Sequence, residues 1–242
     1  MKRAIRLWPG IGLWIFVVYL VSFSCYAPML LERLGAAVPD GLLSLRYGFV
    51  LAPALVSIAF LTHEHGLKYF FHQNIRRVSL KEWGLCIAAA LTGILFTCVC
   101  LSASRNHAAT YPTIPALAAS CAYLFVTALV EETAWRGFFF RHTAAGGDGA
   151  AAAVLTGIVW AGWHIPMWSI RNGLGAAEMV PLFLWAVLLS LVLGLFYNKF
   201  TNLISAALLH MTFNVCFLAP MEYNAALLFA GIIFWREIRK RR

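Results

Sequence analysis

Apolar stretches of about 15 to 25 residues recur from one end of the chain to the other, separated by short polar connections. Each is close to the roughly 20 residues that an α-helix needs to cross the hydrocarbon of a bilayer. The pattern predicts eight helices, at residues 10–29, 43–62, 82–101, 116–141, 149–168, 181–197, 202–218 and 223–235. We therefore expect an all-α fold, a polytopic membrane helix bundle with about eight transmembrane helices, and a single integral membrane domain over residues 1–242.

The composition supports a membrane location. Of the 242 residues, 62% are hydrophobic and only 12% are charged, whereas about a quarter of the residues in an ordinary soluble domain are charged. Too few polar side chains remain to cover a soluble globule. The composition therefore excludes an ordinary soluble domain and makes membrane lipid an expected partner of the chain.

The basic residues are distributed unevenly between the two sides of the predicted bundle. All but four of the 19 Lys and Arg residues fall on the side that holds both termini, and the four others are Arg33, Arg46, Arg105 and Arg171. The net charge of +9 could suggest binding to nucleic acid. The positions of the basic residues instead follow membrane topology, and we expect no nucleic-acid partner. The positive-inside rule makes the richer side cytoplasmic. The prediction is a multi-pass protein of the bacterial cytoplasmic (inner) membrane with both termini in the cytoplasm.

Two connections carry further local signals. In residues 63–81, basic side chains alternate with apolar ones, which fits a basic amphipathic helix on the cytoplasmic surface and an irregular loop equally well. The glycine-rich stretch 146–149 indicates a break, after which Asp148 is a candidate N-cap for the next helix. Pro166 is expected to kink or end that helix, because proline removes one backbone hydrogen bond.

Three predicted helices contain polar side chains that are costly in hydrocarbon. They are Glu131, Glu132 and Arg136 in the fourth helix, His164 in the fifth, and His210 and Asn214 in the seventh. An ionisable group inside a membrane is a candidate functional residue by default. The alternative is an interhelical hydrogen-bond network that only holds the bundle together.

Helical spacing assigns directions to these side chains. Glu132 and Arg136 are four residues apart, so they share a helix face and can form an ion pair. Glu131 projects about 100° away from Glu132, and its carboxylate is expected to be free. His210 and Asn214 are also four residues apart and can project into one cavity.

The resulting set of groups fits the hydrolysis of an amide bond. Trp160 lies one turn before His164, where it can form a wall of the cavity. A carboxylate near an imidazole, here Glu131 and His164, can activate water as a general base. His210 and Asn214 can donate hydrogen bonds to the oxyanion of a tetrahedral intermediate.

The patterns E-E-x-x-x-R, aromatic-x-x-x-H and H-x-x-x-N occur in this order on separate apolar segments. In this arrangement the chain resembles the CAAX protease and bacteriocin-processing enzyme family (CPBP, also called Abi) of intramembrane proteases. The resemblance covers a motif-bearing protease core at about residues 116–218. The family usually has Phe at the first position of the second pattern, where this chain has Trp160, so an aromatic residue is kept.

The resemblance implies a CAAX prenyl protease-like endopeptidase whose substrate is a membrane-associated or lipidated peptide or protein. It implies that Glu131 and His164 activate water and that His210 and Asn214 stabilise the oxyanion. The residues that it implies as supports of the site are Glu132, Arg136 and the aromatic Trp160.

The reaction mechanism and two rival functions stay open at this stage. A divalent metal such as zinc, held by Glu131, His164 and His210, is one alternative, but the chain has no H-E-x-x-H sequence, which favours a metal-free, glutamate-dependent mechanism. The rival functions are a non-catalytic membrane immunity or binding protein and a proton-coupled transporter. No repeat symmetry of the kind common in transporters is visible, and no pattern indicates an oligomeric state.

Overall fold

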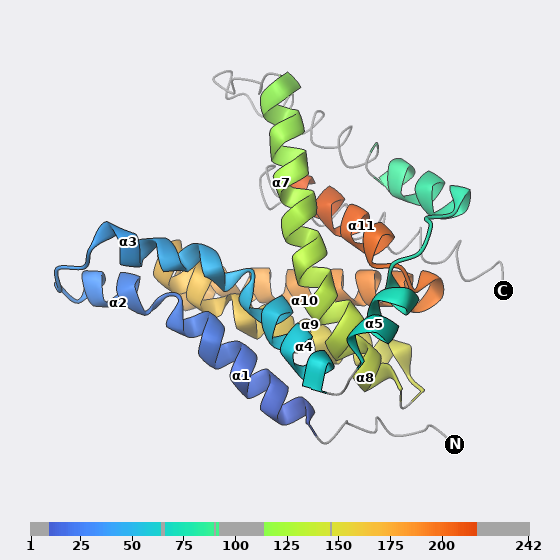
Figure 1. Ribbon diagram of the computed structural model, residues 1–242. Helices are drawn as coiled ribbons and strands as arrows, with labels where there is room; N and C mark the ends of the chain where they lie inside the picture. Colours follow the sequence, from blue (N-terminus) through green and yellow to red (C-terminus); the bar gives the residue numbers. More distant parts are fainter. Residues whose placement is uncertain (1–9, 64–65, 90, 92–113, 146, 217–242) are drawn as a thin grey trace.

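The computed structural model describes residues 10–63, 66–89, 91, 114–145 and 147–216, and all regular structure in these residues is helical, without a strand (Figure 1). The helices are α1 (Ile11–Ser24), α2 (Ala27–Arg33), α3 (Asp40–Leu43), η1 (Ser44–Phe49), α4 (Ala52–His63), α5 (Leu67–Asn74), a helix that begins at residue 80, α7 (Ile114–Glu132), η2 (Thr133–Phe140), α8 (Arg141–Ala144), α9 (Gly149–Pro166), η3 (Met167–Arg171), α10 (Ala176–Phe200) and α11 (Leu203–Cys216). The prediction of an all-α fold is confirmed for this part of the chain.

The first two predicted spans are bent pairs of helices. The axes of α1 and α2 differ by 46°, and the segment from α3 through η1 differs from α4 by 62°. Each bend lies just before a proline in the first turn of the following helix, Pro28 in α2 and Pro53 in α4. Proline fits the first turn of a helix but disfavours helical geometry at the residue before it.

Two helical segments of the described chain are long and apolar enough to cross a membrane alone. They are the continuous run of α9 and η3, with 23 residues, and α10, with 25 residues. Counting each bent pair as one span raises the number to four. The predicted span 223–235 and most of 82–101 lie outside the described residues, so the structure supports an integral membrane protein without confirming eight spans.

Small residues bring α9 and α10 into close contact. A Cβ atom added at Gly157 would lie 2.8 Å from the Cα of Val187, and one at Gly194 would lie 2.6 Å from the Cβ of Ala153. The Ser190 hydroxyl donates a 2.9 Å hydrogen bond to the Ala153 carbonyl across the same interface. Close backbone approach at small residues is how helices associate in lipid, where the hydrophobic effect does not drive their association.

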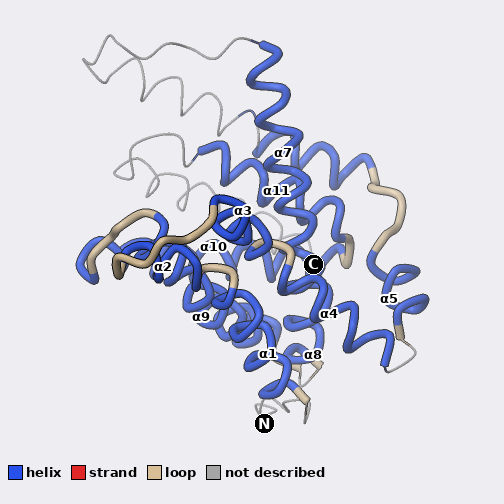
Figure 2. Tube along the Cα trace, turned by 60° about the vertical axis from the view of Figure 1, so that its left-hand side comes forward, coloured by secondary structure: helices blue, strands red, loops and turns tan. Residues whose placement is uncertain are grey.

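A second layer of helices lies across this pair. Helix α7 runs beside α11, and α1 runs beside α4 (Figures 1 and 2). Aromatic side chains fill the space between the layers: Trp14 of α1 stacks on Phe138 of η2 with ring centroids 5.4 Å apart, and its indole N–H donates to Ser57 of α4 at 3.1 Å. This packing holds η2, and with it the end of α7, against α1 and α4.

The described part of the connection at residues 63–81 contains the helix α5. Phe70 and Asn74 are buried, and the Asn74 side chain accepts a hydrogen bond from the Tyr197 hydroxyl of α10. Tyr69 and Phe71 are exposed. The amphipathic helix is therefore present over Leu67–Asn74, but one face of it packs on protein.

A buried carboxylate connects the segment after α5 to the turn between α10 and α11. Glu82 accepts hydrogen bonds from both terminal nitrogens of Arg76 at 3.0 Å and from the Ser205 hydroxyl at 3.2 Å. Arg76 also donates to the Phe200 carbonyl. This group, here called the Glu82 clasp, fixes where α11 begins.

The start and end of α9 follow the sequence signals. The Asp148 carboxylate accepts hydrogen bonds from the backbone N–H groups of Ala150 and Ala151, both at 3.0 Å, which confirms it as the N-cap. At Pro166 the α-helical pattern ends and the chain continues as the π-helical η3. The predicted break at Pro166 is therefore a change of helix type.

Candidate active site

The acidic pair stands at the end of α7, where the helix changes into the π-helical η2. Glu132 Oε1 and Arg136 Nη1 are 2.8 Å apart, and both side chains are fully buried. The ion pair predicted from the four-residue spacing is confirmed. The Arg136 guanidinium also lies over the Trp160 ring, 5.0 Å from its centroid, where a cation–π attraction adds to the pair.

Glu132 makes a second contact that the sequence did not indicate. The same Oε1 atom lies 2.8 Å from Nδ1 of His210 on α11. The two residues are 78 positions apart, so helical spacing could not have revealed the contact. Glu132 thus links α7 to α11 and holds the His210 ring by one of its two nitrogens.

Glu131 is not free, contrary to the expectation from the helix geometry. Its Oε2 atom accepts a 2.9 Å hydrogen bond from the indole N–H of Trp160 on α9. The sequence placed Trp160 as a wall beside His164 but did not anticipate that its ring nitrogen would reach the carboxylate. This bond orients the Glu131 carboxylate toward the fifth predicted span.

The His164 ring is held by its own helix. Its Nδ1 atom lies 2.8 Å from the Trp160 carbonyl oxygen. Because a carbonyl oxygen can only accept a hydrogen bond, this contact requires the proton on Nδ1. In the neutral form of the ring the lone pair is then on Nε2. The Trp168 ring stacks on His164 at 5.3 Å, and the Trp163 ring meets it edge-on at 4.7 Å, so its orientation is fixed.

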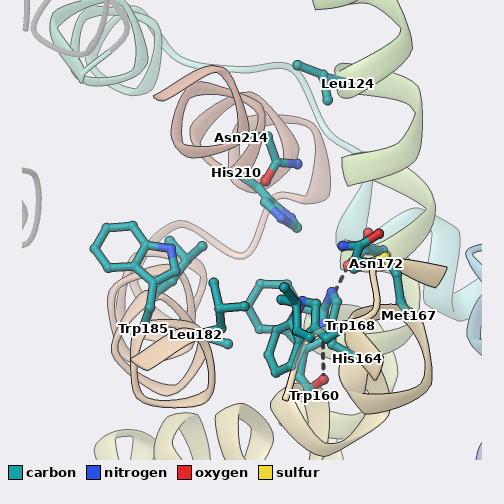
Figure 3. Close-up of a pocket in the computed structure, with 14 residues that line it drawn as sticks. Leu124, Trp160, His164, Met167, Trp168, Asn172, Leu182, Trp185, His210 and Asn214 are labelled. Atoms are coloured by element: carbon teal, nitrogen blue, oxygen red, sulfur yellow. Dashed lines mark hydrogen bonds between the residues drawn. The ribbon is translucent and has the colours of Figure 1, made fainter. Parts of the chain in front are cut away.

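A cavity of about 510 Å³ brings the catalytic candidates together (Figure 3). It is lined by Leu124, Glu131, Trp160, His164, Met167, Trp168, Asn172, Leu174, Leu182, Trp185, Ala186, Leu189, His210 and Asn214. His210 and Asn214 project into it from the same helix, as predicted, and face Trp160 and His164 on the opposite wall. Glu132 and Arg136 do not line the cavity and contact its walls from behind.

Sequence reasoning missed the polar residue Asn172 and the indole of Trp168, which also line the cavity. Both follow from η3: in a π-helix the hydrogen bond runs from residue i to i+5, and Asn172 N–H bonds to the Met167 carbonyl in this way. The only sequence signal for this turn was Pro166. The cavity lies in the half of the bundle that contains the connection between η3 and α10.

The family comparison identifies this part of the chain. A family model described as type II CAAX prenyl endopeptidase Rce1-like matches residues 112–216. We call these residues the Rce1-like domain, after the family that they match. No curated protein matches the chain. The predicted resemblance to the CPBP family is confirmed, and the matched range contains all seven residues predicted for the site.

Both π-helical segments of the Rce1-like domain adjoin its polar residues. The segment η2 begins immediately after Glu132, and η3 begins three residues after His164. Isolated π-helical turns inside α-helices occur frequently at functional sites, because they shift the side chains that follow by about one position around the axis. Here they place Arg136 behind the cavity and Asn172 at its edge.

The geometry of the Rce1-like domain does not fit the metal site considered from sequence. Among the described residues, no three His, Cys, Asp or Glu side chains converge closely enough to hold one metal ion, and this includes Glu131, His164 and His210. Glu131 and His210 each have one polar atom engaged by Trp160 and Glu132. We therefore derive no chemical step through a metal.

Proposed function

We propose that this membrane protein is an intramembrane endopeptidase that hydrolyses a peptide bond in a membrane-associated peptide or protein. The observation that supports this best is the cavity in the Rce1-like domain, where Glu131, His164, His210 and Asn214 come together from three helices.

In this proposal Glu131 and His164 activate the attacking water. Glu131 keeps Oε1 for the water while Oε2 is bound to Trp160. The His164 lone pair on Nε2 provides a second acceptor, because Nδ1 is bound to the Trp160 carbonyl. A water between these acceptors loses a proton as it attacks the peptide carbonyl, and the proton is then available to the leaving amine.

His210 and Asn214 stabilise the oxyanion in the same proposal. The Asn214 amide N–H is a donor in any protonation state. His210 donates through Nε2 only as an imidazolium, because Nδ1 already donates to Glu132. The Glu132 carboxylate is the counter-ion for this charge, and Arg136 and Trp160 hold Glu132 and Glu131 in place.

The charge distribution adds an orientation to the proposal. If both termini are cytoplasmic, the turns between α8 and α9 and between α10 and α11 face the cytoplasm. The connection between η3 and α10, beside which the cavity lies, then faces the opposite side. The proposed substrate is a membrane-associated segment that reaches the cavity laterally or from the non-cytoplasmic side.

The test is cleavage of lipidated and transmembrane reporter peptides by the purified protein in liposomes. Glu131→Gln keeps the shape of the side chain and an acceptor for Trp160, and His164→Ala removes the imidazole. We expect each variant to lower kcat at least about 100-fold, within the usual contribution of general-base catalysis. Glu178→Gln and His72→Ala, which change residues outside the cavity, are matched controls expected to keep wild-type rates.

Chelator is added in a parallel series, and loss of activity that zinc restores would reinstate a metal mechanism. Equal cleavage by wild type and Glu131→Gln would contradict the proposed catalysis. Two results together would favour the binding or immunity function instead. They are absence of cleavage with every reporter, and a Glu131→Gln variant that protects cells in an immunity assay as well as the wild type does.

A further inference from the structure

A second cavity, of about 260 Å³, adjoins the catalytic cavity. Met167 lines both, and Val130, which lines the second, is the residue before Glu131. The second cavity lies between the bend of α1 and α2, the segment η1, the middle of α7 and the end of η3. We call it the arginine pocket, after Arg46 and Arg171, which line it together with Tyr26 and Tyr47.

The arginine pocket is positively charged. The ion pairs among the described residues involve Arg76, Arg136 and His210, so neither arginine of the pocket has a carboxylate partner there. Arg46 donates a 3.2 Å hydrogen bond to the Tyr47 hydroxyl. Glu32, on α2, attracts Arg46 only from beyond ion-pair distance.

A buried hydroxyl in the arginine pocket has no hydrogen-bond partner among the described residues. Tyr26 is 0% exposed, and its hydroxyl oxygen bonds to no protein atom in that part of the chain. Arg171 lies close to this hydroxyl, but a guanidinium can only donate, so it cannot accept the Tyr26 O–H. An unsatisfied buried donor is costly, so an acceptor oxygen supplied by a ligand would satisfy it.

Exposed apolar side chains form the rim of the arginine pocket. The exposed fractions are 58% for Tyr47, 48% for Leu51, 65% for Tyr123 and 58% for Val126. Tyr47 is in η1, Leu51 directly precedes α4, and the other two are on α7. In a membrane bundle, an exposed apolar surface of this kind faces acyl chains. A ligand of this pocket therefore combines an anionic group with a hydrocarbon tail.

We propose that the arginine pocket binds the phosphate of an anionic phospholipid, with its acyl chains along the apolar rim. Guanidinium groups match phosphate oxygens with paired, charge-assisted hydrogen bonds. Tyr26 supplies a further donor from the buried wall. Because Met167 also lines the catalytic cavity, bound lipid packs against the wall that the two cavities share.

The test measures binding directly, so it does not depend on the proposed proteolysis. The purified full-length protein in detergent is titrated with short-chain phosphatidylglycerol, phosphatidylcholine of the same chain length, or inorganic phosphate, and thermal unfolding is followed. A ligand that binds only the folded state raises Tm as its concentration rises. We expect phosphatidylglycerol to raise Tm at concentrations about tenfold lower than phosphatidylcholine, because only it carries net charge for two guanidinium groups.

The variants separate this pocket from general attraction of lipid to a basic protein. Arg46→Gln and Arg171→Gln should each weaken the phosphatidylglycerol effect by about tenfold, whereas Arg77→Gln, an exposed arginine at the other end of the bundle, should not. Tyr26→Phe should weaken the effect without changing charge, and should leave Tm without lipid unchanged.

Three results would overturn the proposal. If Arg77→Gln weakens the phosphatidylglycerol effect on Tm as much as the pocket variants do, the attraction of lipid to the protein is general. If inorganic phosphate raises Tm as much as phosphatidylglycerol does, a soluble anion is the ligand. If the arginine variants instead weaken only the cleavage of reporter peptides with a free terminal carboxylate, the pocket belongs to the substrate.

Discussion

A buried carboxylate that contacts both an arginine and a histidine compensates the charge of the arginine and, when the histidine is protonated, its charge as well. In this protein Glu132 has that position, with Arg136 and His210 both at 2.8 Å. Removing one partner of a buried ion pair leaves the other charge without compensation, which is more damaging than removing both. The catalytic cavity therefore depends on a residue that does not line it.

Glu132→Gln should lower the free energy of unfolding by about 3 kcal/mol, because the Arg136 charge stays buried without its partner. The double variant Glu132→Gln with Arg136→Met should recover much of that stability but no activity, since His210 still lacks its carboxylate. Thermal unfolding in detergent and reporter cleavage measure the two effects separately. Recovery of both together would show that Glu132 has only a structural role.

Trp160 has two functions that substitutions can separate. Trp160→Phe removes the hydrogen bond to Glu131 but keeps an aromatic ring beside His164 and His210, which lie 5.1 and 5.3 Å from the Trp160 ring. We expect kcat to fall about tenfold with KM little changed, as for the loss of one hydrogen bond to a charged group. Trp160→Ala should lower both kcat and stability further, and identical kinetics in the two variants would contradict this division.

At this scale the sequence predicted contacts within a helix and missed those between helices. The Glu132–Arg136 pair and the shared face of His210 and Asn214 follow from a spacing of four residues. The contacts of Glu132 with His210 and of Glu131 with Trp160 depend on how three helices pack. Helical periodicity contains no information about that packing.

At the scale of the elements, α9 and α10 pack closely against each other, and Gly157 and Gly194 permit this close approach. Because α9 carries Trp160 and His164 while α10 carries Leu182 and Trp185, this pair forms two walls of the catalytic cavity. A change in the distance between the two axes alters the cavity directly.

Gly157→Ala should lower the free energy of unfolding by about 1 to 3 kcal/mol, because its Cβ would lie 2.8 Å from the Val187 backbone and overpacking has that cost. Activity should fall as well, since α9 must move relative to α10. Gly12→Ala is the matched control: it also adds one methyl group to a helix, but no atom lies within 4 Å of the new Cβ. Thermal unfolding and cleavage of both variants, measured side by side, test the prediction.

Element positions were predictable from the apolar pattern, whereas helix types and bends were not. The predicted helix 149–168 corresponds to α9 and η3, and 181–197 lies inside the longer α10. The π-helical segments were not predicted. A change of the hydrogen-bonded partner from residue i+4 to residue i+5 over a short segment leaves the hydrophobic pattern almost unchanged. The bends before Pro28 and Pro53 had a sequence signal that the apolar pattern obscured.

For the whole molecule, the proposed orientation makes a prediction about the two ends of the bundle. Ala150 and Ala177 both lie exposed in the first turn of their helices, α9 and α10, which run in opposite directions. In intact cells, a membrane-impermeant maleimide should label Ala177→Cys but not Ala150→Cys, each in a background without other cysteines. Disrupting the cells should make both accessible, and the reverse pattern in intact cells would invert the orientation and place the cavity on the cytoplasmic side.

The Glu82 clasp has a consequence for the biosynthesis of the protein. Helices enter the membrane in the order of synthesis, and Ser205 is made 123 residues after Glu82. Until the turn before α11 arrives, Glu82 lacks partners from that turn, and until α11 itself docks, Glu132 lacks His210. A nascent chain that still lacks α11 therefore has Glu131 and His164 but neither His210 nor Asn214. Under the proposed mechanism it lacks the oxyanion donors, and hydrolysis becomes possible only when the last part of the described bundle has been inserted.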